Sequence, residues 1–162
     1  MLSFDEALSR LLQHAQTVAE VETVSTLEAA GRVLARAQLA TVDVPPLDNS
    51  AMDGYAVACA DVPVPGTCLP VSQRIPAGTV GVPLRAGTAA RIFTGAPIPA
   101  GADAVIMQEL CAQSGSEVIF NHRPRPGDHI RRAGSDIAAG SEMLAAGQRL
   151  RAQDEIGRAS CR

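Results

Sequence analysis

The sequence predicts an α+β protein in which helices are confined to the first 37 residues and a β-rich domain of short strands follows. Apolar residues recur at helical spacing near the N-terminus, and this period disappears after Asp48. Beyond that point, short apolar runs alternate with clusters of Gly, Pro, Asp and Ser, a spacing typical of compact β-rich domains. A length of 162 residues suits one medium domain or two small ones.

A helix is predicted from about residue 4 to about residue 18. Ser3 and Glu6 form a capping box, in which the Ser3 hydroxyl accepts from a first-turn amide and Glu6 reaches back to the Ser3 amide. Apolar residues then follow at helical spacing, so we expect one face of this helix to pack on a core. They are Phe4, Leu8, Leu11, Leu12, Ala15 and Val18.

Two further elements are expected before the β-rich domain. Residues 21–27 are rich in β-branched side chains, which favours a strand. Residues 28–37 are predicted to form a short helix. Gly31 costs this helix about 1 kcal/mol of propensity relative to Ala, so we expect it to allow close packing against another element.

Five apolar runs predict the strands of the β-rich domain, at residues 55–57, 67–71, 89–93, 104–107 and 118–120. The region that follows, residues 130–150, contains Gly134, Gly140 and Gly147 and is expected to be rich in turns.

The composition argues against nucleic acid and membranes as partners. Aromatic residues make up 2% of the chain, which leaves no base-stacking platform, and the net charge of −3 is not a nucleic-acid footprint. No stretch approaches the ~20 apolar residues that span a bilayer, and the first ten residues do not form a signal peptide. We therefore expect a cytoplasmic protein.

The four cysteines show no C-x-x-C spacing, so neither a zinc site nor a redox pair is indicated. We expect buried apolar thiols in a reducing compartment. They are Cys59, Cys68, Cys111 and Cys161.

A polar loop follows the paired prolines and contains the first candidate site. Asp48, Asn49 and Ser50 are of types that stabilise a turn through side-chain to backbone hydrogen bonds, and we favour that role on spacing alone. Asp53 differs, because it stands beside Gly54 at a strand entry, where a backbone can approach a ligand closely. A carboxylate there suits Mg²⁺ or a hydrogen bond to a substrate.

A second candidate begins where the strand at 89–93 ends. Thr94 and Gly95 start a turn that two prolines stiffen. The Thr94 hydroxyl and the neighbouring backbone amides are donors that together suit an oxyanion. A β-turn with a satisfied threonine explains the same residues, and it is the favoured interpretation of the motif alone.

The third candidate pairs Arg131 and Arg132 with Asp136. Two neighbouring arginines bind phosphate or another oxyanion through forked hydrogen bonds. The alternative is a surface ion-pair cluster that contributes about 0–1 kcal/mol and no chemistry.

Two runs give the chain a family resemblance: Asn-Ser-Ala-Met-Asp-Gly-Tyr-Ala at 49–56 and, after it, Thr-Gly-Ala-Pro-Ile-Pro at 94–99. With Gly-Arg-Val-Leu-Ala at 31–35 and the segment 131–140, they make most of the chain similar to the molybdopterin molybdotransferase family. This family is called MoeA in bacteria and the E domain of gephyrin in animals.

The resemblance implies an enzyme that inserts molybdate into the dithiolene of adenylylated molybdopterin, releases AMP and needs Mg²⁺. It gives Asp53, Thr94 and Asp136 catalytic positions, and Arg131 and Ser50 substrate-binding positions. Asp53 is also the candidate ligand for Mg²⁺.

The resemblance implies a fold as well. Residues 1–46 and 137–154 would form a discontinuous, elongated α/β region, and residues 47–136 an inserted β-rich domain of short strands. Family members are homodimers in which the inserted domain faces the catalytic domain of the partner subunit. Molybdopterin adenylyltransferase and the molybdoenzymes are further expected partners.

The motifs that hold pterin and nucleotide in the family, of the types Gly-Asp-Glu-Leu, Gly-Gly-Val-Ser and Gly-Leu-Pro-Gly-Asn-Pro, do not occur in the sequence. The chain therefore resembles the N-terminal half of a family member, and we expect no activity from it alone. The alternative hypothesis is a non-catalytic β-rich module for dimerisation or scaffolding.

Residues 155–162, Glu-Ile-Gly-Arg-Ala-Ser-Cys-Arg, have an unusual property. They back-translate to GAG ATC GGA AGA GCG TCG TGT AGG, which looks like a sequencing-adapter oligonucleotide. We expect the native sequence to end near Asp154, and Cys161 then has no functional meaning.

Deleting residues 155–162 should leave the melting temperature unchanged within error, because Ile156 is the single large apolar residue of this segment. Calorimetry of the 154- and 162-residue chains checks this. About 1 kcal/mol moves a domain of this size by ~2–4 °C, so a drop of several degrees would mean that the segment is native structure.

Overall fold

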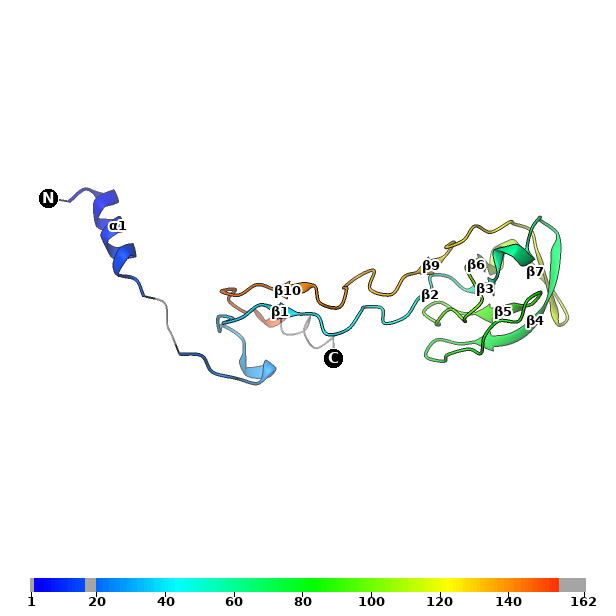
Figure 1. Cartoon of the computed structure of the whole chain (residues 1–162), viewed down its shortest axis with the longest axis horizontal. Helices are drawn as coiled ribbons and strands as arrows, with labels where there is room; N and C mark the ends of the chain where they lie inside the picture. Colours follow the sequence, from blue (N-terminus) through cyan, green and yellow to red (C-terminus); the bar gives the residue numbers. More distant parts are fainter. Residues whose placement is uncertain (1, 17–19, 155–162) are drawn as a thin grey trace.

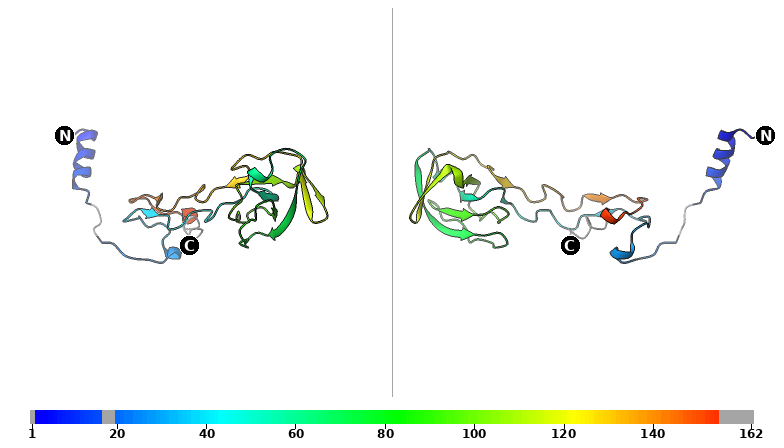
Figure 2. Two further views of the ribbon diagram at one scale, coloured as in Figure 1. Left: turned by 45° about the vertical axis from the view of Figure 1, so that its right-hand side comes forward. Right: turned by 180° about the vertical axis from the view of Figure 1, so that it is seen from behind.

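The computed structural model describes residues 2–16 and 20–154 and is elongated in shape. A single helix lies at one end, a β-rich domain lies at the other, and two extended chain segments run between them (Figure 1). The further views in Figure 2 show the same three parts. The predicted α+β class, an elongated region with a β-rich part of short strands, is confirmed.

Helix α1 spans Phe4–His14 and begins with the predicted capping box. The Glu6 amide donates to Ser3 Oγ at 3.3 Å, and the Ser3 amide donates to Glu6 Oε2 at 2.8 Å. The helix ends four residues earlier than predicted. The expectation that it packs on a core is wrong for the chain as described, because none of its residues is buried.

Residues 20–37 contradict two predictions. The predicted strand at 21–27 is extended chain without a strand partner, followed by the short 3₁₀ helix η1 (Thr26–Glu28). The predicted helix at 28–37 is a turn and irregular chain, which a bridge between Val33 and Arg149 ties down. Gly31 has a φ of +80°, a left-handed conformation that helices exclude, so it serves a turn. Pairing with distant residues overrode the local helical pattern.

Two extended segments form the stem that leads to the β-rich domain. Strand β1 (Gln38–Leu39) pairs antiparallel with β10 (Glu142–Leu144), and β2 (Asn49–Ser50) pairs antiparallel with β9 (Ile130–Arg131). Between these pairs, the Val44 amide donates to the Ile137 carbonyl at 2.8 Å. The stem is therefore a long two-stranded ladder made by segments that are far apart in the sequence.

The β-rich domain is a curled sheet in which six of the described strands follow the order β6-β3-β5-β4-β8-β7. Only the pair β4–β5 is parallel; the other neighbours are antiparallel. The strands are β3 (Gly54–Val57), β4 (Thr67–Ile75), β5 (Ala89–Ile92), β6 (Ala104–Met107), β7 (Cys111–Ser114) and β8 (Glu117–Phe120). All five predicted strands are present, and β7 was missed because its residues are polar or small.

Two short 3₁₀ helices, η2 (Cys59–Asp61) and η3 (Gln108–Leu110), connect strands of this domain. No helix in the described part of the chain is long and apolar enough to cross a membrane.

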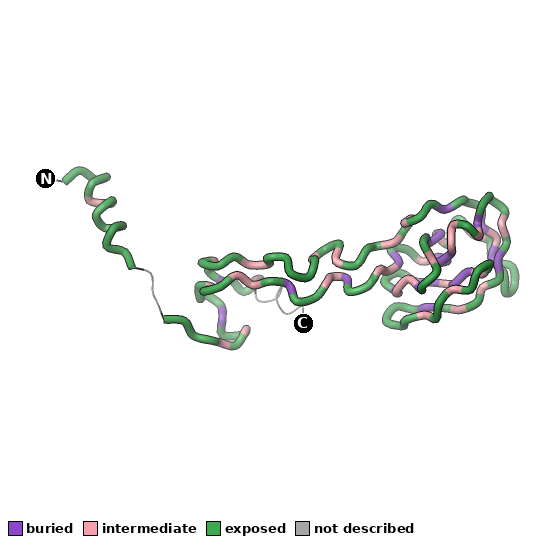
Figure 3. Tube along the Cα trace, viewed as in Figure 1, coloured by how far each residue is buried: buried purple, intermediate pink, exposed green. Residues whose placement is uncertain are grey.

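Apolar side chains pack on both faces of the sheet, which is where the buried residues of Figure 3 gather. Tyr55, Val57 and Phe120 belong to one cluster, and the ring of Tyr55 meets that of Phe120 edge-on at 6.0 Å. Ala56 and Ile92 belong to the other. The four residues of β3 are all buried, because successive side chains of a strand point to opposite faces and both faces are covered.

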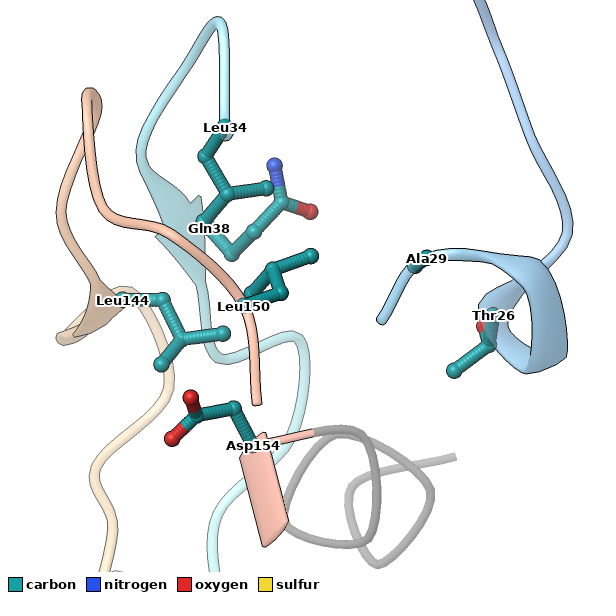
Figure 4. A pocket seen from close by; sticks show the side chains of 7 residues that line it. All are labelled: Thr26, Ala29, Leu34, Gln38, Leu144, Leu150 and Asp154. Atoms are coloured by element: carbon teal, nitrogen blue, oxygen red, sulfur yellow. The ribbon is translucent and has the colours of Figure 1, made fainter. Parts of the chain in front are cut away.

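A small apolar cluster at the stem, shown in Figure 4, encloses a cavity of about 10 Å³. That is room for about one water molecule, so this cavity is no ligand site. Its lining residues are Thr26, Ala29, Leu34, Gln38, Leu144, Leu150 and Asp154.

Gly54 has a structural task that the sequence did not indicate. A Cβ atom at this position would lie 2.0 Å from the Ile106 carbonyl oxygen on the neighbouring strand. The absence of a side chain at Gly54 therefore allows β3 and β6 to pair closely.

We expect Gly54→Ala to lower the free energy of unfolding by about 3 kcal/mol or more, because the backbone of β6 cannot yield without breaking the ladder. Gly66→Ala is the control, since its Cβ meets nothing within 4 Å and adds only the cost of a left-handed residue, about 1–2 kcal/mol. Urea unfolding of both variants measures the difference. Equal losses would mean that the Ile106 contact is unimportant.

Candidate functional site

Asp53 and Thr94 lie together at one end of the sheet. The Thr94 backbone amide donates to Asp53 Oδ1 at 2.8 Å, and the Thr94 hydroxyl donates to the same oxygen at 2.7 Å. Thr94 is exposed and Asp53 half-buried, so both are reachable from solvent. The expectation that these two residues meet on one face, at loop ends, is confirmed as geometry.

The register of β3 with β5 explains why they meet. Gly54 is paired with Ile92 in this antiparallel ladder. The residue before β3 and the residues after β5 therefore leave the sheet at the same end. Asp53 and Thr94 occupy these positions, 41 residues apart in the sequence.

Hydrogen bonding keeps the Asp53 carboxylate ionised. The Thr94 amide lowers the pKa of Asp53 most, the Thr94 hydroxyl lowers it further, and partial desolvation opposes them. The nearby positive charge of Arg91 also lowers this pKa. Both bonds reach Oδ1, and within the described residues Oδ2 accepts no hydrogen bond. Asp53 thus keeps one carboxylate oxygen without a hydrogen-bond partner in the described chain.

The oxyanion-hole interpretation of the Thr94 turn is wrong for this structure. Both donors of Thr94 are directed at Asp53, the Gly95 amide donates to the Ser50 carbonyl at 2.8 Å, and the Ala96 amide donates to the Phe93 carbonyl at 2.9 Å. These donors form hydrogen bonds within the protein that stabilise the turn, which agrees with the favoured interpretation of a β-turn with a satisfied threonine.

Ser50 is buried and its hydroxyl acts locally. It donates to the Met52 carbonyl at 2.5 Å and receives a weak bond from the Met52 amide at 3.4 Å. In the structure Ser50 therefore supports the loop that leads to Asp53, as its residue type suggested.

Arg131 and Asp136 form an ion pair across a short turn of the stem. Their neighbours form a second one, in which Arg132 Nη1 lies 2.5 Å from Asp48 Oδ2 and the Ala133 amide donates to Asp48 Oδ1 at 2.8 Å. The Ala133 amide is the larger cause and Arg132 the next in lowering the pKa of Asp48. All four charged side chains are at least partly exposed.

Strand β2 links the two groups of residues. Asn49 is paired with Arg131 on one side and with Pro97, three residues after Thr94, on the other. The structure thus brings Ser50, Thr94 and Asp53 together and joins them to Arg131 through one strand.

Sequence reasoning missed Arg91, although a charged residue inside the apolar run 89–93 was a signal. Arg91 Nη1 donates to the Gly54 carbonyl at 2.8 Å and Nη2 donates to Gln108 Oε1 at 2.6 Å. Its guanidinium carbon lies 5.2 Å from the centre of the Tyr55 ring and 4.6 Å from that of Phe93.

The three cysteines in the described part of the chain, Cys59, Cys68 and Cys111, are not activated nucleophiles, because the pKa of each is raised. Burial, and next the carboxylate of Asp103, raise the pKa of Cys59 to about 12, and burial raises that of Cys111 to about 11. Both are half-buried, whereas Cys68 is exposed, which corrects the expectation that it is buried. Cys161 lies outside the described residues. No group of three or more His, Cys, Asp or Glu within residues 2–16 and 20–154 is arranged to hold a metal ion.

Comparison with known proteins decides the family. The family described as "MoeA N-terminal region (domain I and II)" matches residues 2–161. The chain belongs to the MoeA family. The site therefore lies on the N-terminal region of a MoeA-family protein, and the end of the native sequence near Asp154 stays a prediction.

Relatives with curated names agree. The chain is 41% identical over 147 residues to the molybdopterin molybdenumtransferase 2 of Mycobacterium tuberculosis, covering 84% of this chain and 36% of the relative. It is 36% identical over 151 residues to the molybdopterin molybdenumtransferase of Haemophilus influenzae, covering 93% of this chain and 37% of the relative. The chain thus spans little more than a third of the length of these relatives.

A solved structure agrees in shape. The crystal structure of the molybdopterin biosynthesis MoeA protein from Pyrococcus horikoshii superposes with a TM-score of 0.89 at 34% identity. The match covers 99% of this chain and 44% of the other. The elongated form is thus shared by a MoeA-family protein.

The two hydrogen bonds from Thr94 predict how the pKa of Asp53 changes when Thr94 is replaced. Thr94→Val removes the hydroxyl and keeps the backbone amide, which is the larger cause. The pKa of Asp53 should rise toward its ordinary value without reaching it. Carbon-detected NMR titration measures this, with Asp48 as internal reference because other residues hold its carboxylate.

A lowered native pKa contributes stability that is present above the unfolded-state value and lost as the pH falls through the native one. The stability difference between wild type and Thr94→Val should therefore shrink on acidification below pH 4. A pKa for Asp53 that is identical in both proteins would contradict the hydrogen-bond assignment.

Proposed function

We propose that this chain forms one wall of the active site of a molybdopterin molybdotransferase, which inserts molybdate into adenylylated molybdopterin and releases AMP. The names of relatives at about 40% identity support a role in molybdenum cofactor biosynthesis. The observation that carries the proposal is the Asp53 carboxylate, which Thr94 holds through one oxygen while the other accepts no hydrogen bond from the described residues.

Asp53 fits a Mg²⁺ ion that is bound jointly by the protein, the substrate and water, rather than one that is surrounded by protein ligands. Mg²⁺ is typically held by one or two carboxylates together with substrate phosphates and water, and Asp53 offers one such oxygen. When bound there, the ion would neutralise negative charge on the substrate phosphates. No complete set of protein ligands is required from this chain.

In this proposal Thr94 positions Asp53 and keeps it ionised, so the residue is ready to bind an ion or a substrate hydroxyl at neutral pH. Ser50 stabilises the loop that leads to Asp53 through its hydrogen bond to the Met52 carbonyl. Arg131 binds an anionic part of the substrate when its ion pair with Asp136 opens, and Asp136 holds the guanidinium in place until then. An exposed ion pair of this kind costs about 0–1 kcal/mol to open.

We further propose that the intact protein is a cytoplasmic homodimer. Helix α1 supports this proposal, because its apolar residues have no cover within the described chain: Phe4 is 80% exposed and Leu11 71%. An exposed apolar stripe of this kind is typical of an association surface. The same feature favours the second candidate, a non-catalytic module for dimerisation or scaffolding.

The purified chain should show no conversion of adenylylated molybdopterin, because one wall cannot orient both reactants. The assay follows AMP release, with an intact molybdopterin molybdenumtransferase as the positive control. Turnover by the chain alone would refute the proposal that it needs further domains.

A chimera tests the site itself. Residues 1–154 would replace the matching part of the H. influenzae relative, to which the chain is 36% identical. We expect Asp53→Asn to lower molybdate insertion by about 100-fold, in the range of a lost electrostatic contact to the transition state, with the melting temperature nearly unchanged.

Asp61→Asn is the matched control. Asp61 also accepts a backbone amide, from Gly87 at 2.8 Å, but it follows the opposite end of β3. It should leave the rate within about twofold. Equal losses in the two variants, or an Asp53→Asn chimera as active as its parent, would favour the non-catalytic module.

A further inference from the structure

An open groove on the β-rich domain lies beside the Asp53–Thr94 pair and has no role in the proposal above. It has a volume of about 550 Å³, within the range of small-molecule sites. Tyr55, Val71 and Phe93 provide apolar surface, and apart from Gly115 the other lining residues are polar or charged. They are Ser72, Gln73, Arg74, Arg91, Gln113 and Ser116.

Strand register places two arginines side by side in this groove. Arg91 of β5 is paired with Tyr55 of β3 on one side and with Arg74 of β4 on the other. Like charges directly opposite each other on neighbouring strands destabilise a sheet. The pairing of Arg74 with Arg91 is therefore electrostatically unfavourable for the sheet.

The guanidinium groups of Arg74 and Arg91 both lie close to the ring of Phe93. The guanidinium carbon of Arg74 lies 4.7 Å from the centre of the Phe93 ring, and that of Arg91 lies 4.6 Å from it. The two carbons cannot be further apart than the sum of these distances. Stacking on an aromatic ring orients a guanidinium and leaves the N–H groups at its edge free to bind.

The charges of the pair are only partly compensated. Asp53 is close enough for Arg91 to lower its pKa, and Arg91 also donates to Gln108 and to the Gly54 carbonyl. The Arg74 side chain has neither an ion pair nor a hydrogen bond to another described residue, so the N–H donors of its guanidinium are unused. A guanidinium has five N–H donors, so Arg91 also retains some.

We propose that this groove binds a doubly charged tetrahedral oxyanion, either free or as the terminal group of a phosphomonoester. The anion would lie between Arg74 and Arg91 and accept charge-assisted hydrogen bonds from both, which removes their mutual repulsion. The groove is larger than a phosphate ion, which leaves room for the body of an ester. The inference does not depend on the transferase activity proposed above.

The test titrates inorganic phosphate, molybdate and AMP into the ¹⁵N-labelled 162-residue chain at constant ionic strength. Saturable shifts are expected at the amides of Arg74, Arg91 and Phe93. Arg74→Gln should weaken binding at least about tenfold, as loss of a charge-assisted contact does. Arg125→Gln, which removes an exposed charge outside the groove, should change it less than twofold.

Thermal unfolding gives an independent readout. At ten times the dissociation constant, the anion should raise the melting temperature of wild type and Arg125→Gln by about 3–5 °C and leave that of Arg74→Gln nearly unchanged. Comparison with Arg74→Gln controls for the general stabilisation that phosphate causes through its exclusion from protein surfaces, because this effect acts on all three proteins alike.

The outcomes separate the two sources of the anion. AMP bound at least tenfold tighter than phosphate would identify a phosphomonoester site, and equal affinities would identify a site for the free anion. Absence of saturable shifts in the groove, or the same loss of affinity in Arg74→Gln and Arg125→Gln, would overturn the proposal. Its failure would leave the Asp53 assignment intact, because that assignment is tested by activity of the chimera.

Discussion

The antiparallel ladder between β3 and β5 brings the start of one strand beside the end of the other, and the candidate site depends on this contact. Asp53 enters the ladder and Thr94 leaves it, so their bond follows from the register of Gly54 with Ile92. The absence of a side chain at Gly54 lets β6 lie against the same strand. A shift of one residue would reverse the faces of all these side chains.

Asp48 and Asp53 both lie near this ladder, but they differ in how many of their carboxylate oxygens are used in hydrogen bonds. Asp48 uses both of its oxygens, one for the Ala133 amide and one for Arg132, and so fastens the end of the stem. Asp53 receives two donors from Thr94 on a single oxygen. Both residues stay ionised for the same physical reason, but only Asp53 retains an oxygen without a partner in the described chain.

The elongated shape follows from the uneven distribution of apolar contacts. The curled sheet has apolar clusters on both faces, whereas the stem is a two-stranded ladder and α1 buries no residue. A two-stranded ladder is marginal by itself. The apolar contacts that stabilise the fold therefore concentrate in the β-rich domain.

The sequence by itself determined the elements that local physics controls. The capping box set the start of α1, and apolar runs between turn residues gave five strands, because both signals act over a few neighbouring positions. The two signature runs also pointed to Asp53 and Thr94. Long-range pairing decided the rest: Val33 joined Arg149 instead of forming a helix. Only the tertiary structure placed Arg91 opposite Arg74, because strand register between distant segments has no local signal.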